Sequence, residues 1–216
     1  MHESYDYGLW TMVFINVVIF AAFAIGFLKP KKKYEWRTLG IFAAFIVALF
    51  TEMYGFPLTI YILLSLFGNK LGVDPFGHVN GHLLGTLFGA PEWVKLVICQ
   101  IGGFVMLIGL WIMGVGWRRI YHGSGDLVTD GPYARVRHPQ YSGLFLVTIG
   151  MLIQWPTILT LIMFPILTCA YYRLSLREEH DMEEKFGDAY REYERSVPRF
   201  VPKAGVKYSK NPEVVA

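Results

Sequence analysis

Long apolar segments alternate with polar ones along the chain. Residues 8–28 form an apolar run of about the 20 residues that a membrane-spanning helix needs. A second run covers residues 39–67 and contains Pro57, which predicts a tilted helix, a kink near Pro57, or both. A third run covers residues 93–116 and is rich in glycine, which favours close packing against a neighbouring helix. Each of the three runs is predicted to cross a membrane.

Two shorter apolar runs follow at residues 144–153 and 157–172, separated by Trp155 and Pro156. Their modest lengths predict a hairpin of short or tilted helices. Beyond them, residues 171–193 show a 3.6-residue apolar period, which predicts a C-terminal helix. The expected fold is therefore all-α. It is a polytopic integral membrane protein with about five transmembrane helices, the last two a helical hairpin, and a cytoplasmic C-terminal helix.

The charged residues support this membrane fold and predict its orientation in the membrane. Hydrophobic residues make up 54% of the chain and charged residues 17%, below the roughly 25% typical of soluble domains. Lys and Arg number 5 in residues 29–37, 4 in 117–140 and 9 in 173–216, but only 1 in 68–92. The positive-inside rule therefore predicts that the three basic segments are cytoplasmic and that the N-terminus lies outside. Basic residues confined to such loops indicate membrane lipids, not nucleic acid, as the partner.

The apolar runs leave no room for a separate soluble domain. We predict one membrane domain over residues 1–216, with N-terminal spans in 1–116, a core with the functional site in 117–202 and a tail in 203–216. The first apolar run is expected to be a retained helix, because no basic region and no small-residue cleavage site accompany it. The glycine-rich loop at 68–92 is predicted to lie outside as short interfacial pieces.

The polar stretch at residues 127–143 interrupts the apolar pattern at the predicted membrane surface. It is rich in Arg, His and Pro, so we interpret it as the floor of an active site. Arg137 and His138 can donate hydrogen bonds, and Pro139 can begin the next helix at its first turn. The free N–H groups at that helix start can hold a carboxylate. The alternative is a plain helix start beside the membrane, with snorkelling cations.

Two adjacent carboxylates on the predicted C-terminal helix are further candidates. Glu179 falls on the apolar side of that helix, three positions before Met182, where a lone charge would be costly. A ligand with a diol or a positive charge would satisfy it. The alternative is that Glu178 and Glu179 pair with nearby cations on a solvated helix face, namely Arg173, Arg177 or His180.

Taken together, these motifs resemble the isoprenylcysteine carboxyl methyltransferase superfamily of integral membrane enzymes, which is similar to the phospholipid methyltransferases. The resemblance covers about residues 117–202. Its most specific part is the Arg-His-Pro-x-Tyr-x-Gly stretch at 137–143, followed roughly forty residues later by the Glu-Glu pair. The supporting matches are Leu127-Val128-Thr129, Gly131-Pro132-Tyr133, Phe186-Gly187, Tyr190, Tyr193 and Arg195-x-Val197-Pro198.

The resemblance implies S-adenosylmethionine as the methyl donor, bound at the cytoplasmic membrane face. The implied cofactor-binding residues are Val128, Tyr133, Arg137, His138, Pro139, Tyr141, Gly143, Glu178 and Glu179. The implied catalytic residues are Glu179, Tyr190 and Arg195, the last aligned with an arginine placed at the acceptor carboxylate. An alternative for Arg195 is an anchor to anionic lipid. Chemically, tyrosines can line an adenine slot, and a carboxylate can accept the ribose hydroxyls.

The implied methyl acceptor is lipophilic: a prenylated cysteine carboxylate, a phospholipid amine, or a small hydrophobic thiol or carboxylate. The alternative function is an NADPH-dependent membrane reductase of the sterol-reductase type, although such reductases are generally longer. His78 and His82 have the spacing of metal ligands on one helix face. Gly77 and Gly81 disfavour a regular helix there, so no metal is predicted. Glu52, inside the second span, is a functional candidate without an assigned role.

Overall fold

The structure, a computed structural model, describes residues 7–28, 32–67, 81–122, 126–203, 205 and 208. Regular structure in these ranges is entirely helical, which confirms the predicted all-α class for the described part of the chain. The helices are α1 (Trp10–Leu28), α2 (Lys33–Phe50), α3 (Leu58–Phe67), α4 (Leu83–Thr86), α5 (Glu92–His122), α6 (Pro139–Gln154), α7 (Ile158–Phe186) and α8 (Asp188–Ser196).

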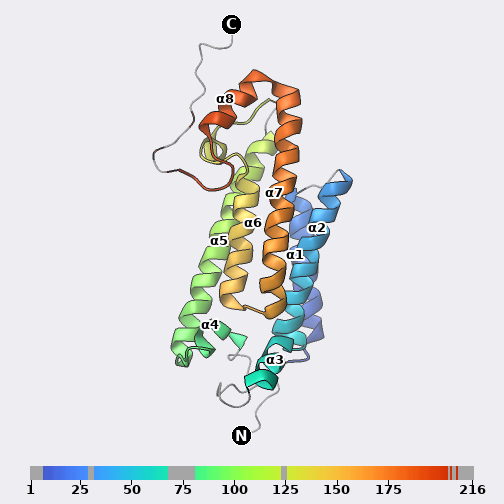
Figure 1. Cartoon of the computed structure of the whole chain (residues 1–216), viewed down its shortest axis with the longest axis vertical. Coiled ribbons are helices and arrows are strands. Elements are labelled where there is room, and N and C mark those ends of the chain that lie inside the picture. Colours follow the sequence, from blue (N-terminus) through green and yellow to red (C-terminus); the bar gives the residue numbers. More distant parts are fainter. Residues whose placement is uncertain are drawn as a thin grey trace.

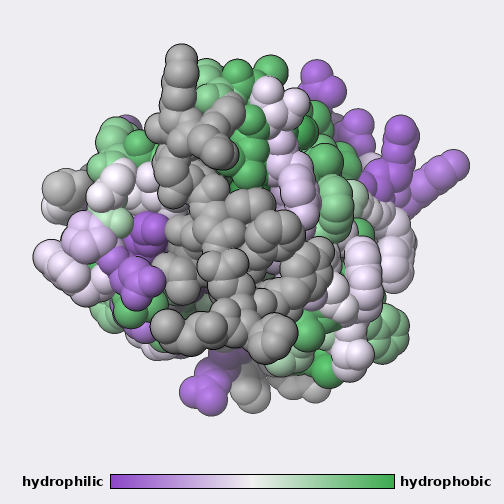
Figure 2. Space-filling model, turned by 90° about the horizontal axis from the view of Figure 1, so that it is seen from below, coloured by the Kyte–Doolittle hydropathy of each residue, from purple (hydrophilic) through white to green (hydrophobic). Residues whose placement is uncertain are grey.

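Five helices, α1, α2, α5, α6 and α7, run along the long axis of the molecule, with α3 and α4 at one end and α8 at the other (Figure 1). Three segments are long and apolar enough to cross a membrane: Lys33–Gly55, Glu92–Ile120 and Ile158–Phe186. Seen along the long axis, hydrophobic side chains lie around much of the rim of the bundle (Figure 2). The number of spans stays a prediction, because α1 and α3 are shorter apolar helices.

The described basic segments gather at one end of the bundle. Residues 32–37, 118–122, 126–137 and 173–203 all lie toward the end that carries α8, at the top of Figure 1. The described part of the glycine-rich loop, residues 81–92, lies at the opposite end, where α4 is one short helical piece of it. Residues 68–80 of that loop lie outside the described residues. Which end faces the cytoplasm stays a prediction from the charge distribution.

The second predicted span is interrupted at the expected place, and the interruption is a break in the helix, not a kink. After α2, a π-helical turn covers Thr51–Gly55, and Phe56 is extended at φ −133° and ψ 113°. Proline disfavours a helical conformation at the residue before it, so Pro57 explains the break. Glu52 is buried in the π turn, and its Oε2 accepts a hydrogen bond from the Thr59 N–H at 2.7 Å, in the first turn of α3. This carboxylate therefore satisfies one free amide at a helix start.

The hairpin forms where predicted, but its second helix is longer than expected. Trp155 ends α6, and Thr157 caps α7, with its Oγ1 accepting from the Thr160 N–H at 3.1 Å. The prediction of a separate helix over 171–193 is wrong, since α7 runs without a break to Phe186. The chain then turns at Gly187, whose φ of +55° lies in the left-handed region that favours glycine. This turn lets α8 fold back over the end of the bundle.

Glycines bring α5 and α6 into close contact. A Cβ atom added at Gly143 would lie 2.5 Å from Met113 Cγ and 2.6 Å from the Gly109 carbonyl oxygen. A Cβ at Gly150 would likewise lie 2.5 Å from the Gly102 carbonyl oxygen. The predicted packing role is thus confirmed for Gly102 and Gly109. The contact fixes the start of α6 against the end of α5, where the functional cavity lies.

Candidate functional site

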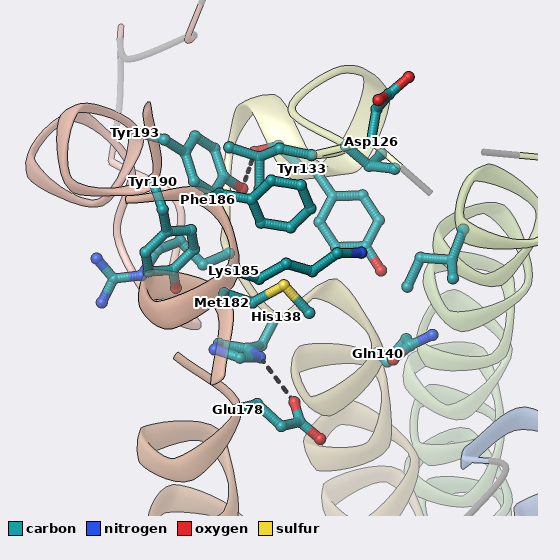
Figure 3. Close-up of a pocket in the computed structure, with 14 residues that line it drawn as sticks. Asp126, Tyr133, His138, Gln140, Glu178, Met182, Lys185, Phe186, Tyr190 and Tyr193 are labelled. Carbon is teal, nitrogen blue, oxygen red and sulfur yellow. Dashed lines mark hydrogen bonds and ion pairs between the residues drawn. The ribbon is translucent and has the colours of Figure 1, made fainter. Parts of the chain in front are cut away.

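A cavity of about 280 Å³ opens at the basic end of the bundle, between the ends of α5 and α7, the start of α6, and α8 (Figure 3). The residues that line it are Ile120, Asp126, Leu127, Val128, Tyr133, Arg137, His138, Gln140, Glu178, Met182, Lys185, Phe186, Tyr190 and Tyr193. Six predicted site residues are among them: Val128, Tyr133, Arg137, His138, Glu178 and Tyr190. Five are not: Pro139, Tyr141, Gly143, Glu179 and Arg195.

Local turns set the position of the cavity floor. Residues Gly131–Ala134 form a 3₁₀ turn that begins at φ +59° on Gly131 and places Tyr133 inward. The Tyr193 hydroxyl donates to the Tyr133 carbonyl oxygen at 2.7 Å, which ties α8 to this turn. Pro139 is the first residue of α6, as predicted, and His138 directly precedes the helix. The floor and the α8 wall are therefore joined by direct contacts.

Glu179 lies behind the cavity wall, at the centre of a cluster of cations. Its side chain is 7% exposed and that of Arg137 8%. Glu179 Oε1 accepts from Arg137 Nε at 3.0 Å and Arg199 Nε at 2.9 Å and lies 3.0 Å from His138 Nε2, while Oε2 accepts from Arg199 Nη2 at 2.6 Å. A buried charge persists only when it is paired and hydrogen-bonded, and both conditions are met here. The predicted alternative, pairing with Arg173, Arg177 or His180, is wrong.

A C-terminal segment, residues 197–200, carries Arg199 to this cluster. Its backbone lies along the start of α6, where the Arg137 N–H donates to the Pro198 carbonyl at 2.9 Å and the His138 N–H to the Arg199 carbonyl at 3.0 Å. The Ser142 hydroxyl donates to the Phe200 carbonyl at 2.7 Å. Sequence reasoning missed Arg199, because no local pattern marks it. The only signal was its place directly after the Val197-Pro198 motif.

His138 joins the buried cluster to the cavity. Its Nε2 lies 3.0 Å from Glu179 Oε1, and its Nδ1 lies 3.4 Å from Glu178 Oε2 (Figure 3). The Tyr141 hydroxyl donates to the other oxygen of Glu178, and the Tyr141 ring stacks on the imidazole with centroids 5.5 Å apart. Tyr141 thus supports the site from outside the cavity. With a carboxylate at each ring nitrogen, the arrangement favours a doubly protonated imidazolium.

The pH dependence of stability follows from that geometry. Burial lowers the pKa of His138, but hydrogen bonds to Glu178 and Glu179 outweigh it, so the pKa is raised above 6.5. A raised folded-state pKa gives stability that is complete below about pH 6.5 and is lost as the pH rises through the folded-state value. We expect the melting temperature in detergent to fall as the pH rises above 6.5. The His138→Gln variant should lose this dependence, and His180→Gln, at an exposed histidine, should keep it. An unaltered profile in His138→Gln would contradict the assignment.

Aromatic rings and a lysine complete the cavity. Burial raises the pKa values of Tyr133, Tyr190 and Tyr193, so these phenols stay protonated and can donate hydrogen bonds. Lys185 extends across the cavity below Phe186 in Figure 3, with Nζ 4.7 Å from the centroid of the Phe186 ring. Sequence reasoning missed Lys185, Asp126 and Gln140. For Lys185 a signal existed, because positions 178, 182 and 185 share one face of a helix.

Arg195 lies apart from the cavity. It is exposed on α8, whereas Tyr190 and Tyr193 are buried on the opposite side of the same helix. Of the two C-terminal arginines Arg195 and Arg199, it is Arg199 that contacts Glu179. At the far end of the bundle, His82 is buried, and its Nδ1 lies 2.7 Å from the Gln154 carbonyl oxygen. His78, the other histidine of that pair, lies outside the described residues.

Comparison with known proteins concerns the part of the chain that builds this cavity. The sequence model of the phospholipid methyltransferase family matches residues 111–189. Protein-S-isoprenylcysteine O-methyltransferase of Schizosaccharomyces pombe is 34% identical over 77 residues, which is 35% of this chain and 33% of that protein. Protein-S-isoprenylcysteine O-methyltransferase B of Arabidopsis thaliana is also 34% identical over 77 residues, 35% of this chain and 39% of that protein. This region is related to the isoprenylcysteine and phospholipid methyltransferases.

The predicted resemblance to that superfamily is therefore confirmed, and its extent is limited. The match covers only 33% and 39% of the length of the two curated relatives. Residues 111–189 include the end of α5, the polar stretch after it, and all of α6 and α7. They supply every residue of the cavity lining except Tyr190 and Tyr193. They do not include α1–α4, nor most of α8, nor the segment that carries Arg199. The cluster around Glu179 thus joins residues within the matched region to one beyond it.

Proposed function

We propose that this chain is a membrane-embedded, S-adenosylmethionine-dependent methyltransferase with a lipophilic acceptor. The observation that carries the proposal is the position of the cavity. It is built largely from the segment that matches methyltransferases, and it lies at the basic end of a bundle of apolar helices. The match to a methyltransferase family favours methyl transfer over the nicotinamide-dependent reductase.

The lining residues fit the donor. At about 280 Å³, the cavity is near the lower end of the roughly 300–1,000 Å³ common for small-molecule sites. Tyr133, Phe186 and Tyr190 offer aromatic surface for an adenine ring, and Lys185 offers a cation for a carboxylate. Glu178, held by His138 and Tyr141, presents a carboxylate for ribose hydroxyls or a sulfonium charge. When bound, S-adenosylmethionine supplies a methyl carbon activated by its sulfonium centre.

The contribution of the chain is to position and shield the reactants. An acceptor that is already an anion or a free amine needs little acid or base help, so most of the barrier is lowered by alignment. We propose that His138 holds Glu178 in place and that Glu179 acts indirectly, by holding Arg137 and His138. Protonated Tyr190 can donate a hydrogen bond to a bound reactant. Pro139 and Gly143 position α6 and need no contact with the donor.

The acceptor is proposed to approach from the lipid side. The curated relatives are named for an isoprenylcysteine acceptor and the matching family for phospholipids, and both acceptors combine a polar reactive group with long apolar chains. A small hydrophobic thiol or carboxylate is a further possibility. Arg195 lies outside the cavity, so any contact with an acceptor carboxylate would occur at the rim of the site. Its planar guanidinium group is suited to that contact.

Calorimetry on the full chain in detergent tests the function. We expect S-adenosylhomocysteine to bind at micromolar concentration and reduced nicotinamide cofactor not to bind, because Lys185 can pair with the carboxylate of the smaller ligand and Glu178 can accept its ribose hydroxyls. The Lys185→Ala variant should weaken that binding. Binding of the nicotinamide cofactor without S-adenosylhomocysteine would overturn the proposal. A screen of labelled donor against lipid, thiol and prenylcysteine pools then identifies the acceptor.

A further inference from the structure

A second depression lies on the flank of the bundle, between α2 and α7. It is lined by Ile41 of α2 and by Pro165, Ile166, Cys169, Ala170 and Arg173 of α7. Ile166 is 53% exposed, and Pro165 and Cys169 are exposed as well, so this groove opens toward the surroundings of the helices. Its floor is apolar and only Arg173 carries a charge. The groove shares no lining residue with the methyltransferase cavity.

Contacts between α2 and α7 show which end of the groove is basic. The Arg177 guanidinium lies 4.9 Å from the centroid of the Tyr34 ring, and Lys32 forms an ion pair with Asp181. The start of α2 therefore lies beside the last turns of α7. About one helical turn further from the basic end lie Arg37, three residues after Tyr34 on α2, and Arg173, four residues before Arg177 on α7.

Exposed cations that pair with no described residue lie at the basic end of both walls of the groove. On α2, Lys33, Arg37 and Ile41 follow at four-residue steps and so lie on one row of the helix. On α7, Ile166, Ala170 and Arg173 follow at steps of four and three residues and so also lie on one side of the helix. Lys33, Arg37 and Arg173 are exposed, and none has an ion pair, hydrogen bond or ring contact with another described residue. Each wall of the groove is thus cationic at the basic end of the bundle and apolar further along the helix.

We propose that this groove binds one anionic phospholipid. Arg37 and Arg173 hold its phosphate, and one acyl chain lies along the apolar floor toward Pro165. The eight helical steps from Pro165 to Arg173 span about 12 Å, enough for the upper part of an acyl chain. Guanidinium groups suit phosphate oxygens because they donate in a fixed planar fork. A zwitterionic lipid would bring its own cation to the same place, so the site favours net negative headgroups.

The bound lipid contacts two helices that already pack against each other. α2 lies outside the region that matches methyltransferases, whereas α7 carries Glu178 and Glu179 of the cavity. A lipid held by both helices stabilises the pairing of the N-terminal helices with the helix of the functional site. The proposal does not depend on methyl transfer, because neither arginine touches the cavity.

Native mass spectrometry of the full chain in neutral detergent tests the site. We expect one molecule of phosphatidylglycerol to remain bound under conditions that remove phosphatidylcholine. The double variant Arg37→Gln/Arg173→Gln should bind it at least tenfold more weakly. The matched control, Arg118→Gln/Arg135→Gln, removes two exposed arginines elsewhere on the basic end and should bind like the parent. Ala170→Phe fills the floor without changing charge and should also weaken binding.

Three outcomes would overturn the proposal. Equal retention of phosphatidylcholine would show no selection for negative headgroups. An equal loss in the control double variant would indicate attraction to the whole basic surface. Displacement by glycerol phosphate as readily as by the lipid would indicate a free-anion site. Melting temperatures near that of the parent verify that each variant is folded, and binding of S-adenosylhomocysteine, which both double variants should retain, keeps this test separate from that of the enzyme.

Discussion

Replacing Glu179 with Ala should lower the free energy of unfolding by about 3–5 kcal/mol, the cost found when one partner of a buried ion pair is removed. The carboxylate faces Arg137, whose side chain is 8% exposed, together with Arg199 and His138. Without it, Arg137 keeps the Glu194 carboxylate as a partner at 3.2 Å but loses the buried one. The Arg199 side chain is more exposed than that of Arg137 and can turn toward solvent. The unpaired charge of Arg137 should therefore account for most of the lost stability.

Denaturant unfolding of the purified protein in detergent measures this effect. Glu184→Ala is the matched control, because Glu184 lies on the same helix, is 70% exposed and pairs only with the exposed His180 among described residues. That variant should unfold close to the parent, since exposed pairs contribute little. A loss in Glu179→Ala no greater than in the control would mean that the cluster does not stabilise the fold. The conservative Glu179→Gln change should fall between the two, because the amide retains an acceptor.

His138→Ala should weaken binding of S-adenosylhomocysteine at least tenfold, equivalent to about 1.4 kcal/mol or more. The imidazole lines the cavity, holds Glu178 at 3.4 Å and stacks on Tyr141. Its removal takes away a donor and leaves Glu178 with only the tyrosine hydroxyl to hold it. The effect on the ligand is therefore larger than the loss of one hydrogen bond.

Calorimetry on the folded variants provides the measurement. His180→Ala, at an exposed histidine two residues beyond Glu178, controls for the loss of an imidazole near the site and should bind like the parent. Comparison at equal folded fraction, judged from the melting transition, separates binding from stability. If folded His138→Ala binds the ligand as tightly as the parent, His138 is not part of the cofactor site.

The sequence alone determined the helices and several of their ends. Apolar runs, Pro57, Pro139 and the Trp155-Pro156 pair predict where helices begin and stop, because backbone geometry and solvation act over a few neighbouring residues. The glycines of the third run likewise predicted close packing. The motif residues 137–143 and the Glu-Glu pair identified the superfamily. The Gly187 turn was missed, because the apolar period continues across it.

Only the tertiary structure decided which polar groups meet. Arg173, Arg177 and His180 are cations near Glu179 in the sequence. Its partners in the structure lie 42, 41 and 20 positions away, at Arg137, His138 and Arg199. Such pairings depend on how α6, α7 and the C-terminal segment pack, and local periodicity contains no information on that. The same packing separates Glu178, which faces the cavity, from Glu179, which does not. Neighbouring residues on a helix point about 100° apart, so Glu178 can line the cavity while Glu179 pairs with the buried cations.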